Sequence, residues 1–188
     1  MEQSTEKPSH QPLAALMAAL GAIFAAEARA GGTDAYQALS KALGGLPAGP
    51  FAAPPDPAAL DGALADPKAA PLCRIVAEAR DWFCWRSLEG MEGVAETRFI
   101  GPTSPYPITE PVVGLVLVSQ GGAMRRDGTA EETLFLLAGT GIWTGPEGRN
   151  EALAPTRFLH RPAGQDLACR AETGPVLAAF RQSATPRG

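Results

Sequence analysis

Histidine is scarce in this 188-residue chain, which contains only His10 and His160. A mononuclear metal centre built from several imidazoles is therefore excluded, because such a site needs three or four ligands. The length is enough for one domain with a hydrophobic core, or for one domain with a helical arm.

Cysteine is also rare, and Cys73, Cys84 and Cys169 form no C-x-x-C pair. An odd number of cysteines does not predict a disulfide framework, so we expect reduced thiols in the cytoplasm. The alanine-rich stretch 13–30 is not preceded by a cationic segment and ends with Glu27 and Arg29. It therefore does not fit a signal peptide or a membrane span.

The chain also has no excess of basic residues. Sixteen Lys and Arg stand against twenty Asp and Glu, giving a net charge of −4, and the basic residues do not cluster. We therefore expect no nucleic-acid partner and no membrane partner. Gly121 and Gly122 lack the lysine that follows in a phosphate-binding loop, and no G-x-S-x-G elbow occurs.

The first half of the chain has helical periodicity. One apolar stripe predicts a helix from about residue 13, followed by a Gly31-Gly32 stop and a second start at Thr33-Asp34. The proline- and glycine-rich segment 44–57 predicts a loop. Two further helices are expected, over 58–65 and 72–88. The stripe consists of Leu13, Leu16, Met17, Leu20 and Phe24.

After about residue 95 the pattern changes to short β-branched runs separated by glycine and proline turns. Strands at this spacing without intervening helices indicate a closed sandwich or barrel. We therefore expect a mainly β protein, with a helical arm over residues 1–94 packed on a β-barrel over 95–188. An exposed barrel edge would allow a homodimer. The expected strands are 112–118, 133–138, 142–144, 157–160, 167–171 and 176–181.

Several motifs of this half resemble those of the cupins. Glu132 is followed after six residues by Gly139, as at the end of the first cupin motif, and Pro162-Ala-Gly164-Gln-Asp-Leu167 is similar to the second. Leu137-Ala-Gly-Thr-Gly-Ile-Trp143 resembles a turn found in one cupin branch, the dimethylsulfoniopropionate (DMSP) lyases. Further similar segments occur upstream in the same order; they are 71–74, 85–86, 100–102 and 114–115.

The resemblance implies a cupin-type double-stranded β-helix barrel with an N-terminal helical extension. It also implies an enzyme that cleaves DMSP to dimethyl sulfide and acrylate, with a divalent metal such as Zn, Fe or Mn held by histidines and a glutamate. A tyrosine two residues after the glutamate acts as the base in this family. The metal polarises the substrate carboxylate while the base accepts the α-proton.

The matching positions of this sequence depart from that ligand set. Arg126 and Gly128 stand where the first motif has its histidines, and Leu167 stands where the second motif has its own. The tyrosine position is Leu134, and of the ligands only Glu132 remains. One carboxylate does not hold a divalent ion usefully, and an arginine at a ligand position would repel it. The sequence therefore predicts no metal cofactor.

The remaining candidates each allow two interpretations. Glu132 is either functional or simply paired with Arg125 or Arg126. Arg126 is either a clamp for a ligand carboxylate, in the place of the metal, or part of a solvated hairpin tip. His160 is a weak catalytic candidate, with a surface role as the alternative. Trp143, Trp85 and Tyr106 could line a pocket for a sulfonium group by cation–π attraction, or could anchor the core.

The sequence thus favours a DMSP-lyase-like cupin with a degenerate metal site. Such a protein would be a pseudoenzyme that binds or senses a small carboxylate or sulfonium compound, with Arg126, Glu132, Trp143 and Tyr106 at the site. The alternative is an active lyase that acts on DMSP or a related carboxylate through a non-standard site, with Glu132 or His160 as the catalytic residue.

Overall fold

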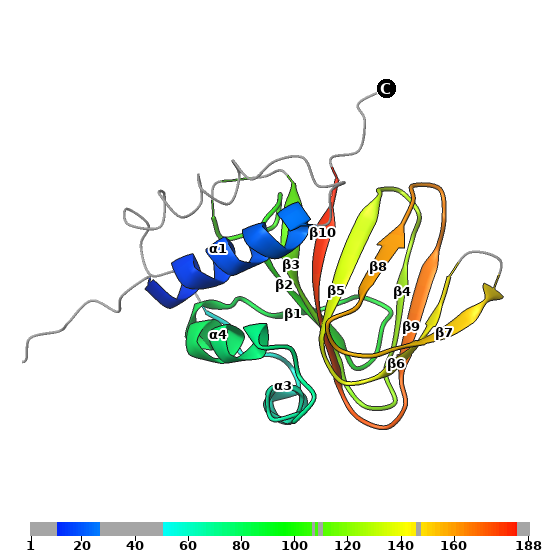
Figure 1. Cartoon of the computed structure of the whole chain (residues 1–188), viewed down its shortest axis with the longest axis horizontal. Helices are drawn as coiled ribbons and strands as arrows, with labels where there is room; N and C mark the ends of the chain where they lie inside the picture. Colours follow the sequence, from blue (N-terminus) through cyan, green and yellow to red (C-terminus); the bar gives the residue numbers. More distant parts are fainter. Residues whose placement is uncertain (1–10, 27–50, 107, 109–110, 146–147, 184–188) are drawn as a thin grey trace, which may run out of the picture.

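The computed structural model describes residues 11–26, 51–106, 108, 111–145 and 148–183. In these residues, three α-helices and a short 3-10 helix come first along the chain and ten strands follow. Figure 1 shows their arrangement. The helical elements are α1 (Gln11–Ala26), α3 (Pro57–Leu64), α4 (Leu72–Ala79) and η2 (Arg80–Trp82). The strands are β1 (Arg86–Ser87), β2 (Val94–Ile100), β3 (Val112–Val118), β4 (Ala123–Arg126), β5 (Glu132–Ala138), β6 (Gly141–Thr144), β7 (Asn150–Leu153), β8 (Phe158–Arg161), β9 (Leu167–Ala171) and β10 (Val176–Gln182).

The strands form two antiparallel sheets that face each other (Figure 1). One sheet has the order β1-β2-β3-β10-β5-β8 and the other has the order β4-β9-β6-β7. Apolar side chains of both sheets meet in the space between them, which we call the lumen. The mainly β barrel expected from the sequence is therefore present. The apolar lumen residues include Val116, Met124, Leu134, Leu136, Trp143, Leu167, Cys169 and Phe180.

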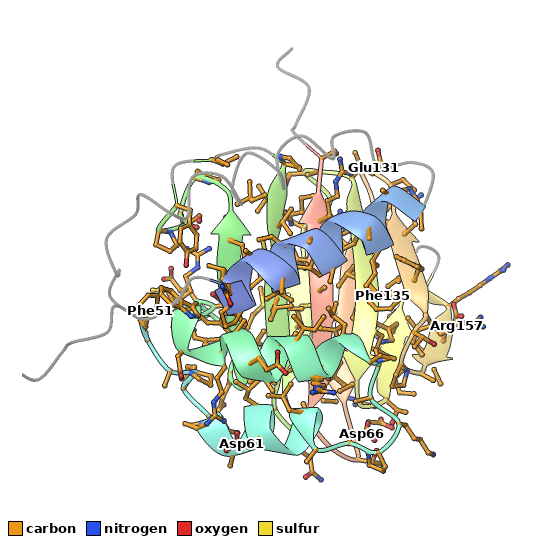
Figure 2. All side chains as sticks on the ribbon, turned by 60° about the vertical axis from the view of Figure 1, so that its left-hand side comes forward. Phe51, Asp61, Asp66, Glu131, Phe135 and Arg157 are labelled. Carbon is orange, nitrogen blue, oxygen red and sulfur yellow. The ribbon has the colours of Figure 1, made fainter. Side chains whose placement is uncertain are left out.

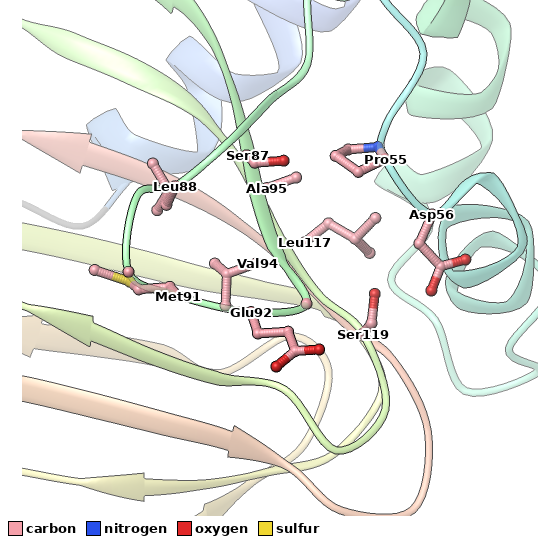
Figure 3. Close-up of a pocket in the computed structure, with 12 residues that line it drawn as sticks. Pro55, Asp56, Ser87, Leu88, Met91, Glu92, Val94, Ala95, Leu117 and Ser119 are labelled. Atoms are coloured by element: carbon pink, nitrogen blue, oxygen red, sulfur yellow. The ribbon is translucent and has the colours of Figure 1, made fainter.

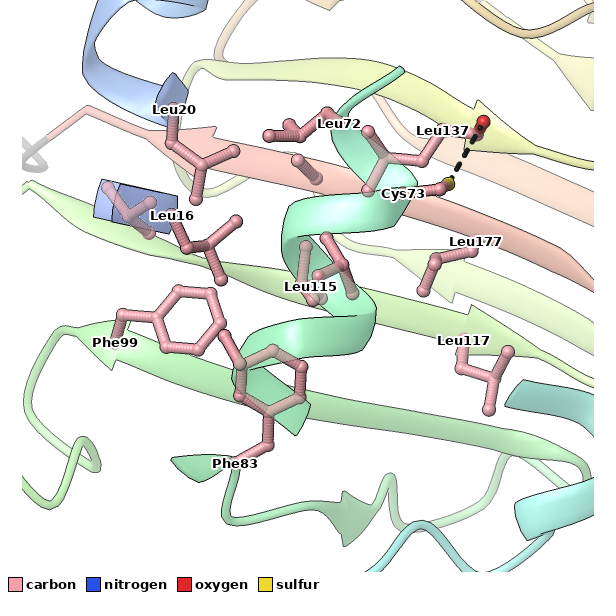
Figure 4. Close-up of a cluster of buried hydrophobic side chains, with 14 of the residues drawn as sticks. Leu16, Leu20, Leu72, Cys73, Phe83, Phe99, Leu115, Leu117, Leu137 and Leu177 are labelled. Atoms are coloured by element: carbon pink, nitrogen blue, oxygen red, sulfur yellow. Dashed lines mark hydrogen bonds between the residues drawn. The ribbon is translucent and has the colours of Figure 1, made fainter. Parts of the chain in front are cut away.

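The helices cover the outer face of the six-stranded sheet, as Figure 2 shows for α1, α4 and α3 lying across it. The buried face of α1 is the stripe predicted from the sequence. It packs with α4 and with outward-facing residues of β2, β3, β5 and β10, including Phe99 and Leu115 (Figure 4). Two hydrogen bonds tie this layer to the strand β5: Leu137 O accepts from the Ala70 amide at 2.6 Å and from Cys73 Sγ at 3.5 Å.

Each strand predicted from the sequence is present to within a residue or two, and α3 agrees with the helix expected over 58–65. The helix expected over 72–88 is wrong in its second half. It ends at Ala79 and tightens into η2, after which Phe83 is extended. The reason is tertiary: the aromatic residues after Ala79 are buried against the sheet, and Arg86 pairs with β2. The helix expected near Thr33 lies outside the described residues.

Four strands were not predicted: β1, β2, β4 and β7. They are short or carry charges on their inward face, so they show no apolar run. Because β1 and Val94 of β2 already belong to the six-stranded sheet, the strands begin before residue 95. All three cysteines are free thiols. None of the helices in the described segments is long and apolar enough to cross a membrane.

Candidate functional site

One end of the lumen is charged. Register places Glu132 at the start of β5 opposite Arg161 at the end of β8, and both side chains point into the lumen. Glu96 and Arg98 lie on β2 with one residue between them, so they share the inward face. Arg126 ends β4 on the opposite sheet. The strands β2, β5 and β8 of one sheet and the end of β4 on the facing sheet thus bring together charges that are far apart in the sequence.

Arg126 spans the space between the two sheets. Its Nη2 lies 3.3 Å from Glu96 Oε2 and its Nε lies 3.5 Å from Glu132 Oε1. The guanidinium carbon lies 4.5 Å from the centroid of the Phe180 ring, which is a cation–π contact. Arg126 is 9% exposed, so it is not part of a solvated hairpin tip. Glu132 is thus paired with Arg126, which is one of the two roles that the sequence allowed for it.

The Phe180 ring lies over Gly114, its register partner on the neighbouring strand β3. A Cβ on Gly114 would lie 2.1 Å from Thr97 O and 2.9 Å from Phe180 Cζ. Any side chain at this position would therefore have to displace β2 and would also press on the Phe180 ring.

Glu132 is fully buried, and both of its carboxylate oxygens have partners. Oε2 lies 3.4 Å from Arg161 Nη2, and Oε1 accepts from Gln182 Nε2 at 3.3 Å in addition to its contact with Arg126. The donor set around Glu132 does not fit a divalent cation, since a metal needs several anionic or lone-pair ligands and its neighbours are guanidinium groups and an amide. No cluster of three or more His, Cys, Asp or Glu that could hold a metal occurs among residues with a described position.

Glu96 is the second fully buried carboxylate. Arg98 Nε donates to its Oε1 at 2.8 Å, and Arg86 Nη2 pairs with the same oxygen. Burial alone would raise the pKa of Glu96, but the charges of Arg126, Arg86 and Arg98 together outweigh it and hold the pKa below its usual value. Glu96 is therefore a stable anion and a weak proton acceptor.

A depression of about 450 Å³ lies beside Arg126, at the end of the four-stranded sheet where the outward-facing Arg125, Thr144 and Ala168 also lie. Arg126 forms part of its wall, and the exposed carboxylates of Asp127 and Asp166 lie at its rim. The loops that carry these two residues touch, because the Gly164 amide donates to Gly128 O at 2.6 Å. The other residues of this depression are Met91, Arg125, Thr144, Gly145, Leu167 and Ala168.

His160 lies on the opposite face of the sheet from this site. It is paired in register with Thr133, whose Oγ1 is 3.3 Å from His160 Nδ1, and its Nε2 is 3.3 Å from Glu131 Oε1. Side chains alternate along a strand, so His160 points away from the lumen that its neighbour Arg161 enters. His10 lies outside the described residues.

The aromatic candidates are divided between the two sides of the sheet. Trp143 is buried in the lumen, where it belongs to the apolar cluster. Trp85 and Tyr106 pack in the layer between helices and sheet, and the Tyr106 hydroxyl donates to Trp82 O at 3.3 Å. Burial raises the pKa of Tyr106 to about 12. The structure therefore does not bring Tyr106 and Trp143 into one pocket.

Of the other positions taken from the resemblance, two face the lumen, whereas Gly128 lies in the turn after β4 against Gly164. Leu134 and Leu167 are both in the apolar lumen cluster, and Leu167 is the register partner of Arg126 across β4 and β9. Glu96 and Arg161 were missed by the sequence analysis. The alternation of Glu96 and Arg98 within an otherwise apolar segment was a signal for the first, whereas only the register of β5 and β8 reveals Arg161.

A second depression, of about 490 Å³, lies at the other end of β2, between the turn after β1 and the start of α3 (Figure 3). Its two carboxylates are less suited to ligand binding. Asp56 caps α3 by accepting from the Ala59 amide at 3.0 Å, and Glu92 is exposed. The charged end of the lumen is the better candidate, because buried charges are held there at a cost in solvation.

Comparison with solved structures bears on the fold. The DMSP lyase DddQ from Ruegeria pomeroyi DSS-3 matches with a TM-score of 0.60 at 20% identity, over 76% of this chain and 78% of that one. The fold is the cupin-type barrel with an N-terminal helix. A structure described with the DMSP lyases RdDddP and RnDddQII matches this chain with a TM-score of 0.61 at 18% identity, over 82% of this chain and 91% of that one.

The sequence comparisons give no further assignment. No protein-family model matches the chain, and no curated protein matches it significantly. The structural likeness at this identity establishes the fold alone, and the function of the chain has to be argued from the residues of the site.

Proposed function

We propose that this cupin binds a small carboxylate-containing molecule at the charged end of its lumen and does not run a metal-dependent lyase reaction. The ligand would approach Arg126 from the depression that this residue helps to line. The guanidinium group would hold its carboxylate, as the sequence analysis suggested for Arg126.

One observation carries this proposal: Arg126 is nine-tenths buried, yet its Nε and Nη2 form no well-directed hydrogen bond. The distances of 3.3 and 3.5 Å to the two glutamates are long for charge-assisted hydrogen bonds, which are usually about 2.7–2.9 Å. A buried donor without a good acceptor is costly. An incoming carboxylate could satisfy it with the planar two-point geometry that guanidinium favours.

The donor set around Glu132 supports the second half of the proposal. A metal-assisted removal of an α-proton needs a Lewis acid and a base. Glu132 is committed to two arginines, and Glu96 is a poor base because its pKa is lowered. An active lyase with a non-standard site remains the alternative function, and the experiment below is designed to detect it.

The test combines binding, metal content and turnover. We expect calorimetric titration with propionate to show saturable binding that weakens about tenfold or more in Arg126→Gln, because an ionic hydrogen bond is lost. Arg157→Gln, which changes an exposed arginine at the other end of β8, should bind as the wild type does. Purified protein should contain far less than one equivalent of Zn, Fe or Mn.

Two results would overturn the proposal. Absence of propionate binding, or equal binding by both variants, would remove the carboxylate site at Arg126. Release of dimethyl sulfide from added DMSP, measured in the headspace at a rate above that of a heat-inactivated control, would establish the lyase alternative.

A further inference from the structure

The charged end of the lumen also indicates which class of carboxylate fits. We infer that the site selects plain anionic carboxylates and discriminates against ligands whose tail carries a sulfonium or quaternary ammonium group. This inference rests on the proposed carboxylate site at Arg126.

The first support is the charge balance among the described residues that line this end. Four guanidinium groups, of Arg86, Arg98, Arg126 and Arg161, surround two carboxylates. Arg86 is 41% exposed, so its charge is screened, whereas Arg126 and Arg161 are buried. Like charges repel strongly where water is largely excluded, so the buried part of the site favours a ligand that adds negative charge only. A cationic tail next to Arg126 would be repelled.

The second support is that neither buried carboxylate is free to receive a cation. Glu96 already contacts three arginines. Glu132 contacts two arginines and the amide of Gln182. An onium group would have to displace a guanidinium from one of them, and this would leave a buried arginine without its partner.

The third support concerns aromatic rings, which are the other common receptor for onium groups. At the charged end, Phe180 already has the Arg126 guanidinium against its ring, 4.5 Å from the centroid. Trp143 is only 2% exposed and packs in the apolar part of the lumen. Within the described part of the chain, Tyr106 and Trp85 lie on the other side of the sheet. The rings of this barrel therefore offer no open cage beside Arg126.

The rim of the depression is the feature that opposes this inference. Asp127 and Asp166 are exposed there and could attract a cation. Asp127 already accepts a hydrogen bond from Thr129 Oγ1 at 2.9 Å. Charges that face water are screened, so their attraction is weaker than the repulsion from the buried arginines.

A matched pair of ligands isolates the tail charge. DMSP and 4-methylpentanoate have the same carboxylate and the same branched tail, and they differ by a positively charged sulfur in place of a neutral CH group. We expect wild-type protein to bind 4-methylpentanoate about tenfold tighter than DMSP or better in calorimetric titration at low salt. The same discrimination should persist in Arg157→Gln, and it should shrink severalfold in Arg126→Gln.

The outcomes separate the two proposals. If DMSP binds as tightly as 4-methylpentanoate or more tightly, the selectivity inference fails while the carboxylate site survives. If its affinity then falls in Asp166→Asn, the rim receives the onium group. If neither compound binds, the carboxylate site itself fails and the selectivity inference falls with it. Circular dichroism of each variant shows whether a lost affinity reflects lost folding.

Discussion

The two faces of the six-stranded sheet differ in what they bury. Its outer face is apolar, with Phe99 and Leu115 among its buried residues, and it is covered by α1, by α4 and by Phe83 of the segment before β1. Its inner face is apolar over most of its length but ends in the buried charges of Glu96 and Glu132. Burial of apolar surface stabilises the first layer directly, whereas the charged end is stable only because each ion has partners.

This contrast indicates where function is to be expected. Apolar residues of the outer layer are sufficiently explained by packing between helices and sheet. Buried charges cost solvation energy and often could be replaced by apolar residues without loss of stability. Their presence at one end of the lumen therefore points to a role beyond folding, which the carboxylate site at Arg126 would supply.

The largest expected effect tests the outer layer. Phe99→Ala should lower the free energy of unfolding by about 3–5 kcal/mol, because Phe99 is 1% exposed and its ring centroid lies 5.2 Å from that of Phe83. Urea denaturation measures this change. Phe51→Ala is the control, since Phe51 is exposed and makes a single edge contact with Trp82; its cost should be about 1 kcal/mol. Equal costs would show that the outer layer is loosely packed.

A smaller effect is expected in the lumen. Arg126→Met keeps much of the side-chain volume and removes the charge from both glutamates, which retain their other arginines. We expect a loss of about 2 kcal/mol, below that of a carboxylate left without any partner. Arg74→Met should cost about 0.3 kcal/mol, because Arg74 pairs with Glu78 on the exposed face of α4. If the Arg126 variant proved as stable as the Arg74 variant, the buried ion pairs of Arg126 would contribute nothing to the free energy of unfolding.

The smallest expected effect is on the pH dependence of the free energy of unfolding, and we expect it to arise from Glu96 in the lumen. The pKa of Glu96 is lowered in the folded protein. The ionised carboxylate therefore contributes fully to the free energy of unfolding above its pKa in the unfolded chain, which is about 4.3. That contribution is lost as the pH falls from there through the folded-state pKa. Glu96→Gln should therefore flatten the decline of stability below about pH 4.3.

Urea titrations at several pH values between neutral and strongly acidic conditions measure this slope. Glu78→Gln is the matched control, since Glu78 is exposed on α4. An unchanged slope in Glu96→Gln, or an equal change in both variants, would contradict the assignment of this acid sensitivity to the lumen.

The outer layer was largely predictable from the sequence, while the charged end was predictable only in part. The stripe from Leu13 to Phe24 fixes the buried face of α1 because helical periodicity is local. Glu132 and Arg126 were identified by their positions in the motifs. Arg161 was passed over in favour of its neighbour His160, since a single residue of register decides which of the two side chains enters the lumen.

By itself, the sequence determined the mainly β barrel, the N-terminal helix and the scarcity of histidine, because these depend on residue type and local periodicity. Only the tertiary structure decided which charges meet. Arg126 reaches two carboxylates on the other sheet, and Glu132 finds Arg161 twenty-nine positions away. Such pairs depend on how strands align and how two sheets face each other, and neither is encoded in any one segment of the chain.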